Sequence, residues 1–244
     1  NVLSSICESP KKNLKSQTLE SGKPTWLESA HFNSRDQSER DFFLDFLNLT
    51  NDNSNPTFIE KGRINDDAIV DQIINYEPDL LVCYGSSMIK SILIQKFEGR
   101  FLNVHLGLSP YYRGTGTNVW PIINDELDMI GATFMHIDEG IDTGKIIHQI
   151  RADLKIGDSP HSVGNRLIRE MVRVYSDIIA NFDHLSSEEQ PAAKGKLFLR
   201  KHFDKGACEK LYSRIRSKSI EQYLRKEERS FPYIVENKGL ALHD

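Results

Sequence analysis

The longest apolar stretches of the chain are short and are separated by polar, turn-forming segments. Residues 79–84 read DLLVCY and residues 101–104 read FLNV. Continuous apolar runs of this length are typical of strands that are covered on both faces of a parallel sheet. Gly85 ends the first run. Residues 2–6 and 57–60 predict two shorter strands nearer the N-terminus.

Helical spacing of apolar residues fills the intervals between these runs. Residues 65–76 open on Asn-Asp-Asp, a typical helix start, and then place apolar residues three and four apart. Residues 41–49 and 89–97 show this spacing over shorter lengths, and residues 162–182 predict a long amphipathic helix. Residues 8–40 show little periodicity and predict a helix of uncertain length and a loop.

The order strand, helix, strand, helix, strand before residue 105 predicts a parallel sheet with right-handed crossovers. Ligand sites in such sheets lie beyond the carboxyl ends of the strands. Asn103 and His105 stand at that end of the 101–104 strand, which marks them as candidates before any motif is considered. The later pattern predicts a helix at 118–124 and strands at 130–137 and 146–150.

The pattern divides the chain into an α/β domain at residues 1–182 and an extension at residues 183–244. The extension begins with a polar linker at 183–195, and its short charged helices predict a surface appendage or contact element.

Composition and charge narrow the class of protein. Hydrophobic residues make up 39% of the 244 residues and charged residues 27%, which is typical of a globular protein. The net charge of −4 offers no general attraction to nucleic acid, and no apolar run reaches the roughly 18–20 residues that span a bilayer. The three cysteines form no CxxC pair and favour a reducing, cytoplasmic location. Of these, Cys83 is interpreted as a buried small apolar residue.

Two dense stretches carry the candidate chemistry. One is FLNVHLGLSPYYRGTGTNVW at residues 101–120, and the other is MHIDEGIDTGK at residues 135–145. In order and spacing, these stretches closely resemble the folate-dependent formyltransferase family. The resemblance lies in Asn-Val-His at 103–105, Ser-Pro-Tyr-Tyr-Arg-Gly at 109–114 and His-Ile-Asp-Glu-Gly-Ile-Asp-Thr-Gly at 136–144. The resemblance covers about residues 57–182.

This resemblance implies a Rossmann-like formyltransferase fold, with a mostly parallel central sheet, helices on both faces and a small helical C-terminal appendage. It implies 10-formyltetrahydrofolate as the formyl donor, with no metal. The implied catalytic residues are Asn103, His105 and Asp142. The implied folate pocket is formed by Ser86, Ser87, Met88, Ile89, Asp138, Glu139, Gly140 and Ile141.

The residue types suit attack of an amine on a formyl carbon. Asn103 can donate an amide N–H to the oxygen that gains negative charge, and His105 can donate as well. Asp142, directly or through a water, can accept the proton that the attacking amine loses, and it can keep His105 protonated.

Several neighbouring residues keep two interpretations. Asp138 is either a brace of its loop or a functional group, and Arg113, next to Gly114, is either a loop brace or a contact to an acceptor phosphate. Glu139 is expected to face solvent or to lie near folate. His136 is interpreted as a packed residue or a neighbour of the site, and Tyr111, Tyr112 and Trp120 as packing residues.

The chain departs from the family pattern at several points. Leu106 and Gly107 replace the usual proline and serine, and residues 115–118 (TGTN) replace a small, apolar run. The usual first strand is not visible in residues 1–56 and is expected to precede Asn1. Residues 183–244 are too few and too helical for the β-barrel domain with which methionyl-tRNA formyltransferases grip tRNA.

We therefore expect a small phosphate-bearing amine acceptor, with a nucleotide-linked amino sugar first and glycinamide ribonucleotide second. Arg113 and Gly114 are the expected acceptor contacts. No nucleic acid or membrane partner is expected, and a homodimer is compatible with the sequence. Two alternatives stay open: a 10-formyltetrahydrofolate hydrolase at the same site, and a non-catalytic folate-binding module.

Overall fold

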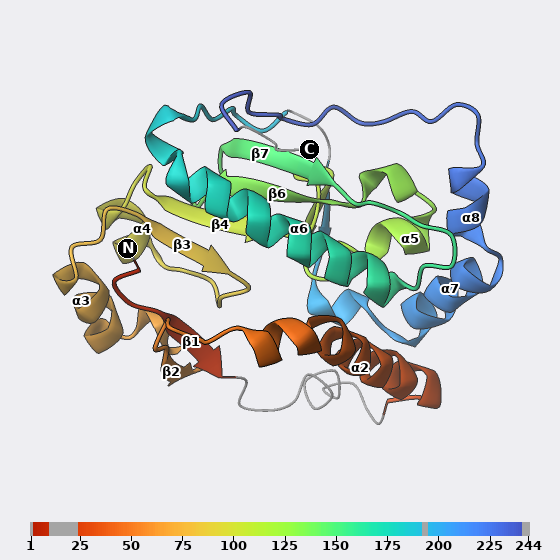
Figure 1. The fold of residues 1–244 in the computed structure, drawn as a ribbon, viewed down its shortest axis with the longest axis horizontal. Helices are drawn as coiled ribbons and strands as arrows, with labels where there is room; N and C mark the ends of the chain where they lie inside the picture. Colours follow the sequence, from red (N-terminus) through yellow and green to blue (C-terminus); the bar gives the residue numbers. More distant parts are fainter. Residues whose placement is uncertain (1, 10–23, 192–194, 241–244) are drawn as a thin grey trace.

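A four-stranded sheet forms the centre of the molecule (Figure 1). The structure is a computed structural model that describes residues 2–9, 24–191 and 195–240. The strand order is β3-β4-β6-β7, with bounds β3 Leu81–Tyr84, β4 Phe101–His105, β6 Gly131–His136 and β7 Ile146–Arg151. The strands predicted from the apolar runs are therefore confirmed, within one or two residues at each end.

The sheet is mixed rather than mostly parallel. β3 and β4 run parallel, as the intervening helix α4 (Ser91–Lys96) requires, whereas β4 pairs antiparallel with β6 and β6 pairs antiparallel with β7. The expectation of a mostly parallel sheet is wrong for this second half. The short loop between β6 and β7 accounts for the second of these pairings, because only antiparallel neighbours can be joined without a long crossover.

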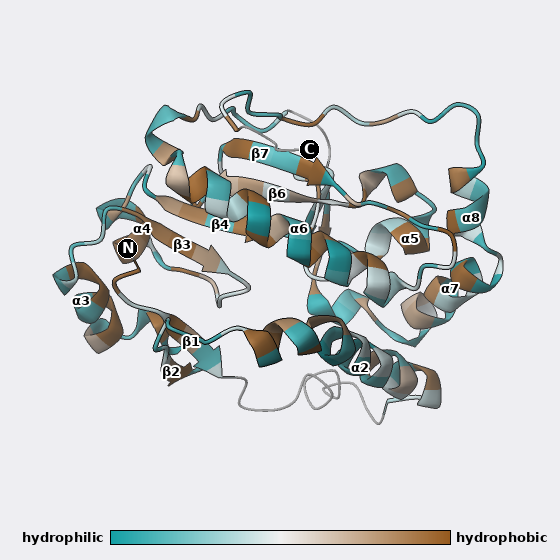
Figure 2. Ribbon diagram, in the orientation of Figure 1, coloured by the Kyte–Doolittle hydropathy of each residue, from teal (hydrophilic) through white to brown (hydrophobic). Residues whose placement is uncertain are grey.

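Helix α6 (Pro160–Ala180) covers one face of this sheet (Figure 1). Its N-cap Ser159 forms a reciprocal capping box with Ser162, which fixes where the helix begins. Leu102 and Val104 of β4 pack in one buried cluster with the apolar side of α6, while its polar side faces outward (Figure 2). The amphipathic helix predicted at 162–182 is confirmed.

The other face of β4 carries Phe101, Asn103 and His105, because side chains alternate along a strand. Phe101 belongs to a second buried cluster, to which α4 and helix α3 (Asp67–Asn75) contribute. Helices therefore cover both faces, as expected. Next to this cluster, β1 (Ile6–Ser9) and β2 (Thr57–Glu60) form a separate parallel pair. The N-terminal strand predicted at 2–6 thus begins four residues later, at Ile6.

Helix α2 (Trp26–Leu49) is the longest helix and the least predictable one. It includes the predicted helix at 41–49 and extends it over two dozen residues. Residues 8–40 show little periodicity because α2 buries few side chains, Glu28 and His31, and neither is apolar. Residues 10–23 of that segment lie outside the described part. Phe46 and Leu49, near its C-terminal end, are exposed. The homodimer that is compatible with the sequence stays a prediction.

The C-terminal segment packs into the main core. Strand β8 (Lys196–Phe198) pairs parallel with β5 (Tyr112–Gly114), 84 positions earlier in the chain. Helices α7 (Lys205–Arg216) and α8 (Ser219–Leu224) bury Cys208, Leu211 and Ile220. The remaining elements of the described residues are α5 (Trp120–Asn124) and the short 3₁₀ turns η2 (Arg63–Asn65), η3 (Leu127–Met129), η4 (Phe182–His184) and η5 (Arg200–His202). The predicted helices at the C-terminus are confirmed, whereas the boundary at 182–183 stays a prediction.

Within the described ranges, no helix combines the length and apolar character that a bilayer crossing requires.

Candidate active site

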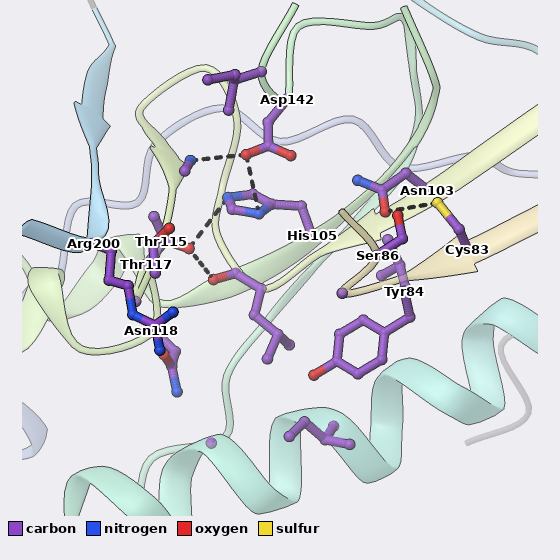
Figure 3. Close-up of a pocket in the computed structure, with 18 of the residues that line it drawn as sticks. Cys83, Tyr84, Ser86, Asn103, His105, Thr115, Thr117, Asn118, Asp142 and Arg200 are labelled. Carbon is purple, nitrogen blue, oxygen red and sulfur yellow. Dashed lines mark hydrogen bonds and ion pairs between the residues drawn. The ribbon is translucent and has the colours of Figure 1, made fainter. Parts of the chain in front are cut away.

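A cavity of about 800 Å³ opens at the carboxyl ends of β3 and β4, where the strand order predicts a ligand site. The three predicted catalytic residues, Asn103, His105 and Asp142, all line it (Figure 3). Figure 3 places Cys83 and Ser86 on the Asn103 side of the cavity, and Asn118 and Arg200 beyond His105 on the opposite side. The cavity therefore has two ends, with the three residues between them.

Asn103 is oriented by a thiol on the neighbouring strand. The Cys83 Sγ lies 3.4 Å from Asn103 Oδ1. Burial raises the pKa of the Cys83 thiol to about 11, so the thiol keeps its hydrogen and donates it to this oxygen. With Oδ1 engaged, the amide nitrogen of Asn103 is the end left to donate into the cavity. Cys83, interpreted from the sequence as a small apolar residue, thus acts through its S–H.

His105 is buried and has both ring nitrogens against protein groups. Its Nδ1 lies 3.3 Å from Asp142 Oδ2, and its Nε2 lies 3.1 Å from the carbonyl oxygen of Tyr112 and 3.2 Å from Thr117 Oγ1. Burial lowers the pKa of His105, and the Asp142 carboxylate and the Tyr112 carbonyl oppose that shift. Both ring nitrogens of His105 are therefore engaged by protein groups, which fix the orientation of the ring.

Asp142 is held by a glycine of the loop opposite. The backbone N–H of Gly114 donates to Asp142 Oδ2 at 2.8 Å. Gly114 has a φ of 92°, and a Cβ there would lie 2.1 Å from the carbonyl oxygen of Phe198. No side chain fits at this point, because β5 and β8 approach so closely. Gly114, predicted as an acceptor contact, lines the cavity and also positions Asp142.

The first end of the cavity is formed by residues 85–89, which follow β3. All four predicted folate-pocket residues of this loop, Ser86 to Ile89, line the cavity. Glu8 on β1 accepts the backbone N–H groups of Ser87 at 2.7 Å and Gly62 at 2.8 Å. Burial would raise the pKa of Glu8, but hydrogen bonds from these two N–H groups, the Ser87 hydroxyl and the Ile64 N–H lower it. Glu8 is a site-supporting residue that the sequence pattern did not indicate.

The loop between β6 and β7 completes this end. The Thr143 hydroxyl lies 2.7 and 2.9 Å from the two carboxylate oxygens of Asp138, and the Gly140 N–H donates to the same carboxylate at 3.0 Å. Asp138 is therefore a brace of its loop, one of its two predicted interpretations. The side chain of Gln190 donates to the carbonyl oxygens of Asp142 and Gly144, at 2.9 Å each, and holds the loop from the C-terminal side.

The second end of the cavity is built from segments that no motif marked. Its lining includes Arg35 on α2, His161 on α6 and Arg200 on η5, together with the ring of Phe203. His161 is 8% exposed, and its Nε2 has no partner within the described structure. Arg35 also pairs with Asp36 at 2.7 Å, and Glu39 lines the cavity beside it. The two guanidinium groups and the unpartnered ring nitrogen still suit this end to a polar, anionic group.

The other predicted residues divide clearly. Gly140 and Ile141 line the cavity, whereas Glu139 does not line it and instead accepts a hydrogen bond from the Ser91 hydroxyl at 2.7 Å. Arg113 does not line the cavity either, and the cations in its lining are Arg35, Lys61 and Arg200. His136 lines the cavity, and burial lowers its pKa. Tyr112 and Trp120 are core residues whose rings stack on Phe198.

Among the described residues, no group of three or more histidine, cysteine or acidic side chains could hold a metal ion.

A family model described as formyl transferase matches residues 9–179, more than half of the chain. Methionyl-tRNA formyltransferase of Clostridioides difficile (strain 630) is 30% identical over 138 residues, which are 53% of this chain and 44% of that protein. GDP-perosamine N-formyltransferase of Brucella melitensis is 30% identical over 110 residues, or 45% of this chain and 42% of that protein. The chain thus spans less than half the length of these curated relatives.

A solved structure is similar over a larger share of its length. The formyltransferase PseJ from Anoxybacillus kamchatkensis, in complex with UDP-4,6-dideoxy-4-formamido-L-AltNAc and tetrahydrofolate, aligns with a TM-score of 0.53 and 22% identity. The alignment covers 70% of this chain and 90% of that chain. At this identity the likeness is one of fold, and it confirms the fold class predicted from the two motif stretches.

Proposed function

Since the chain belongs to the formyl transferase family, we propose that it transfers a formyl group from 10-formyltetrahydrofolate to the primary amine of a small, phosphate-bearing acceptor. The observation that carries the proposal is the convergence of Asn103, His105 and Asp142 on one cavity, with Nδ1 of His105 3.3 Å from Asp142 Oδ2. A site that only bound folate would not need a carboxylate at this point.

The first end of the cavity suits the donor. Its lining combines apolar side chains, Met88, Ile89 and Ile141, with backbone groups of two loops that are braced by other residues. Flat, partly apolar ligands bind in such clefts, where a few fixed polar groups set their orientation. PseJ, which has this fold, is described in complex with tetrahydrofolate. These observations support residues 86–89 together with Asp138, Gly140 and Ile141 as the donor pocket.

The three residues then divide the chemistry. When bound, 10-formyltetrahydrofolate supplies the formyl carbon that the acceptor amine attacks. Asn103 donates its amide N–H to the formyl oxygen as that oxygen gains negative charge. Asp142 accepts the proton that the amine loses as the new C–N bond forms, and a proton returns to the departing nitrogen of the folate as the old C–N bond breaks. His105 acts through Asp142, since its two ring nitrogens face Asp142, Thr117 and the Tyr112 carbonyl.

The second end of the cavity supports a phosphate-bearing acceptor. Arg35 and Arg200 line it, and Figure 3 shows Arg200 across His105 from Ser86. Guanidinium groups are the side chains best suited to phosphate oxygens. GDP-perosamine N-formyltransferase is named for a nucleotide-linked sugar, and PseJ is described in complex with another. We therefore favour a nucleotide-linked amino sugar over glycinamide ribonucleotide, with Arg35 and Arg200 rather than Arg113 as the phosphate contacts.

The decisive experiment is an acceptor screen with 10-formyltetrahydrofolate, in which tetrahydrofolate is followed by absorbance and the formylated product by mass spectrometry. We expect formyl transfer to at least one nucleotide-linked amino sugar, and no formate when the amine is left out. Formate without amine would identify a hydrolase. Folate binding with neither product would identify a non-catalytic binding module, and both results would contradict the proposal.

Asp142→Asn tests the role of the carboxylate with any acceptor that the screen finds. The amide keeps the shape and can still accept the Gly114 N–H, but it cannot take a proton. We expect kcat to fall by about 100-fold or more, as is typical when a general base is lost. Asp183→Asn is the matched control, because Asp183 does not line the cavity. Full turnover of Asp142→Asn would show that this mechanism is wrong.

A further inference from the structure

The surroundings of His105 Nε2 fix the hydrogen on that nitrogen. One neighbour, the Tyr112 carbonyl oxygen at 3.1 Å, can only accept a hydrogen bond. The other, the Thr117 hydroxyl at 3.2 Å, has a single hydrogen, which it donates to the carbonyl oxygen of Leu106 at 2.6 Å. Thr117 therefore offers only a lone pair to the ring. Both neighbours accept, so Nε2 must be the donor.

This arrangement decides what happens at the other nitrogen. A neutral imidazole with its hydrogen on Nε2 presents a bare lone pair at Nδ1, and Nδ1 faces Asp142 Oδ2 at 3.3 Å. Two lone pairs at this distance repel each other, so the contact is favourable only when a proton lies between them. That proton belongs to the pair, either as imidazolium beside carboxylate or as imidazole beside carboxylic acid.

Gly107 provides the room for this arrangement. A Cβ at position 107 would lie 2.5 Å from His105 Nε2, 2.8 Å from the Thr117 Cβ and 2.8 Å from the Tyr112 carbonyl oxygen. All three are the groups that meet at Nε2. Any side chain at position 107 would therefore have to displace His105 or Thr117. Gly107 and Thr117 are both departures from the family pattern. The first leaves empty the space beside Nε2 that the side chain of the second partly fills.

We propose that Thr117 and Gly107 together form a positioning device that keeps the hydrogen on Nε2 of His105 and thereby commits Nδ1 to the proton shared with Asp142. Thr117 provides the lone pair, and Gly107 provides the space. The proposal deepens the proposed function and rests on it for its catalytic consequence. Within the described residues, Asp142 is the charged group that faces the ring, and the nearby Cys83 thiol stays protonated.

The arrangement of hydrogens can be measured without any turnover. Two-dimensional ¹H–¹⁵N NMR of imidazole-labelled protein distinguishes ring nitrogens that carry a hydrogen from those that do not, and His105→Gln assigns the signals. We expect Nε2 to carry its hydrogen throughout the pH range in which the fold is stable, while any titration is seen at Nδ1. A bare Nε2 at neutral pH would overturn the proposal.

Thr117→Val removes the hydroxyl and keeps the shape of the side chain. We expect kcat to fall about tenfold, the scale of one lost hydrogen bond, with KM for both substrates within about twofold. The ring would hold its proton less tightly, so the alkaline limb of the kcat profile should move to lower pH. Thr117→Ser should restore both, and Thr57→Val, on exposed β2, should leave both unchanged.

Gly107→Ala tests the space independently. The added methyl group should displace the ring, so we expect kcat to fall by about 100-fold and the Nε2 signal to change, while binding of 5-formyltetrahydrofolate at the donor end is retained. Wild-type kcat and pH profile in both Thr117→Val and Gly107→Ala would overturn the proposal. If the NMR result holds and no formyl transfer is found, the proposed function fails and the positioning device stands.

Discussion

The two ends of the cavity are built in different ways. The donor end consists of two loops, 85–89 and 138–144, which directly follow β3 and β6 and lie within the part of the chain that the family model matches. The acceptor end draws on α2 and on the first turns of α6, which the family model also matches, and on residues 199–203, which lie beyond the matched range. The two loops of the first end each follow a strand directly and are braced from outside by Glu8 and Gln190, whereas the second end is itself built from distant segments. The donor end should therefore respond to changes within its own loops, and the acceptor end to changes in distant segments.

The largest effect is expected at the donor end. In Gly140→Ala, the new Cβ would lie 1.9 Å from Thr143 Oγ1, so the loop must move and the Asp138–Thr143 contact must break. We expect kcat/KM for the donor to fall about 10- to 100-fold, because small displacements at a reacting centre are costly. Steady-state kinetics against donor and acceptor concentration measure this. KM for the acceptor should stay within twofold.

Gly206→Ala is the matched control, because the nearest atom to a Cβ at this position, on α7, lies at an ordinary 3.4 Å. Equal losses for donor and acceptor in Gly140→Ala would show that the two ends are not independent.

A smaller effect, on binding of the acceptor rather than the donor, is expected at the acceptor end. Arg200→Met and Arg35→Met each remove one cation from the cavity lining. We expect KM for the acceptor to rise about tenfold in each, the scale of one charged hydrogen bond, with KM for the donor unchanged. Product inhibition by the free nucleotide should weaken in parallel.

Arg216→Met is the control, because Arg216 lies at the end of α7 and does not line the cavity. If Arg113→Met alone raises KM for the acceptor, the assignment of the phosphate contacts to Arg35 and Arg200 is wrong.

The smallest effect concerns stability at the acceptor end. Burial lowers the pKa of His31 to about 3, helped by His161 and Arg35, and burial lowers the pKa of His161 to about 4. An unfolded histidine has a pKa of about 6.5. Between these values the unfolded chain binds protons that the folded chain does not, so the free energy of unfolding falls as the pH drops from 7 towards 4.

His161→Gln should flatten this dependence by roughly 1–2 kcal/mol at pH 5. Since His161 Nε2 has no partner in the described structure, the change removes no hydrogen bond there. Thermal unfolding at pH 7.5 and pH 5 measures the effect, with exposed His184→Gln as the control. Parallel curves for wild type and His161→Gln would contradict this account.

The same contrast explains what the sequence could predict. The strand pattern marks Asn103 and His105, because the carboxyl ends of strands in an α/β sheet meet at one edge, whereas Asp142 is implied by the resemblance to the formyltransferase family. Arg35 and His161 gave no such signal. α2 has only two buried residues, Glu28 and His31, so little periodicity marked it as a helix. Which face of a weakly patterned helix meets the site is decided by tertiary packing, which a local pattern does not record.

Two expectations differ from the structure for physical reasons. Arg113 is expected as an acceptor contact because it adjoins the motif, but adjacency does not determine direction: Gly114 lines the cavity and Arg113 does not. The sheet was expected to be mostly parallel because its first half alternates with helices. The turn after His136 is too short for a crossover, and its length was already visible in the sequence.

The pairing of β5 with β8 has a consequence for how the protein is made. When a ribosome has released residues 101–145, all three central residues exist, yet Phe198, whose carbonyl oxygen accepts the Thr115 N–H at 2.7 Å, has not been synthesised. Domains generally acquire structure in the order of synthesis. The nascent chain can therefore form the donor end early, whereas the loop that holds Asp142 through Gly114 gains its partner strand only after some 50 more residues, about 3 to 10 seconds at common elongation rates.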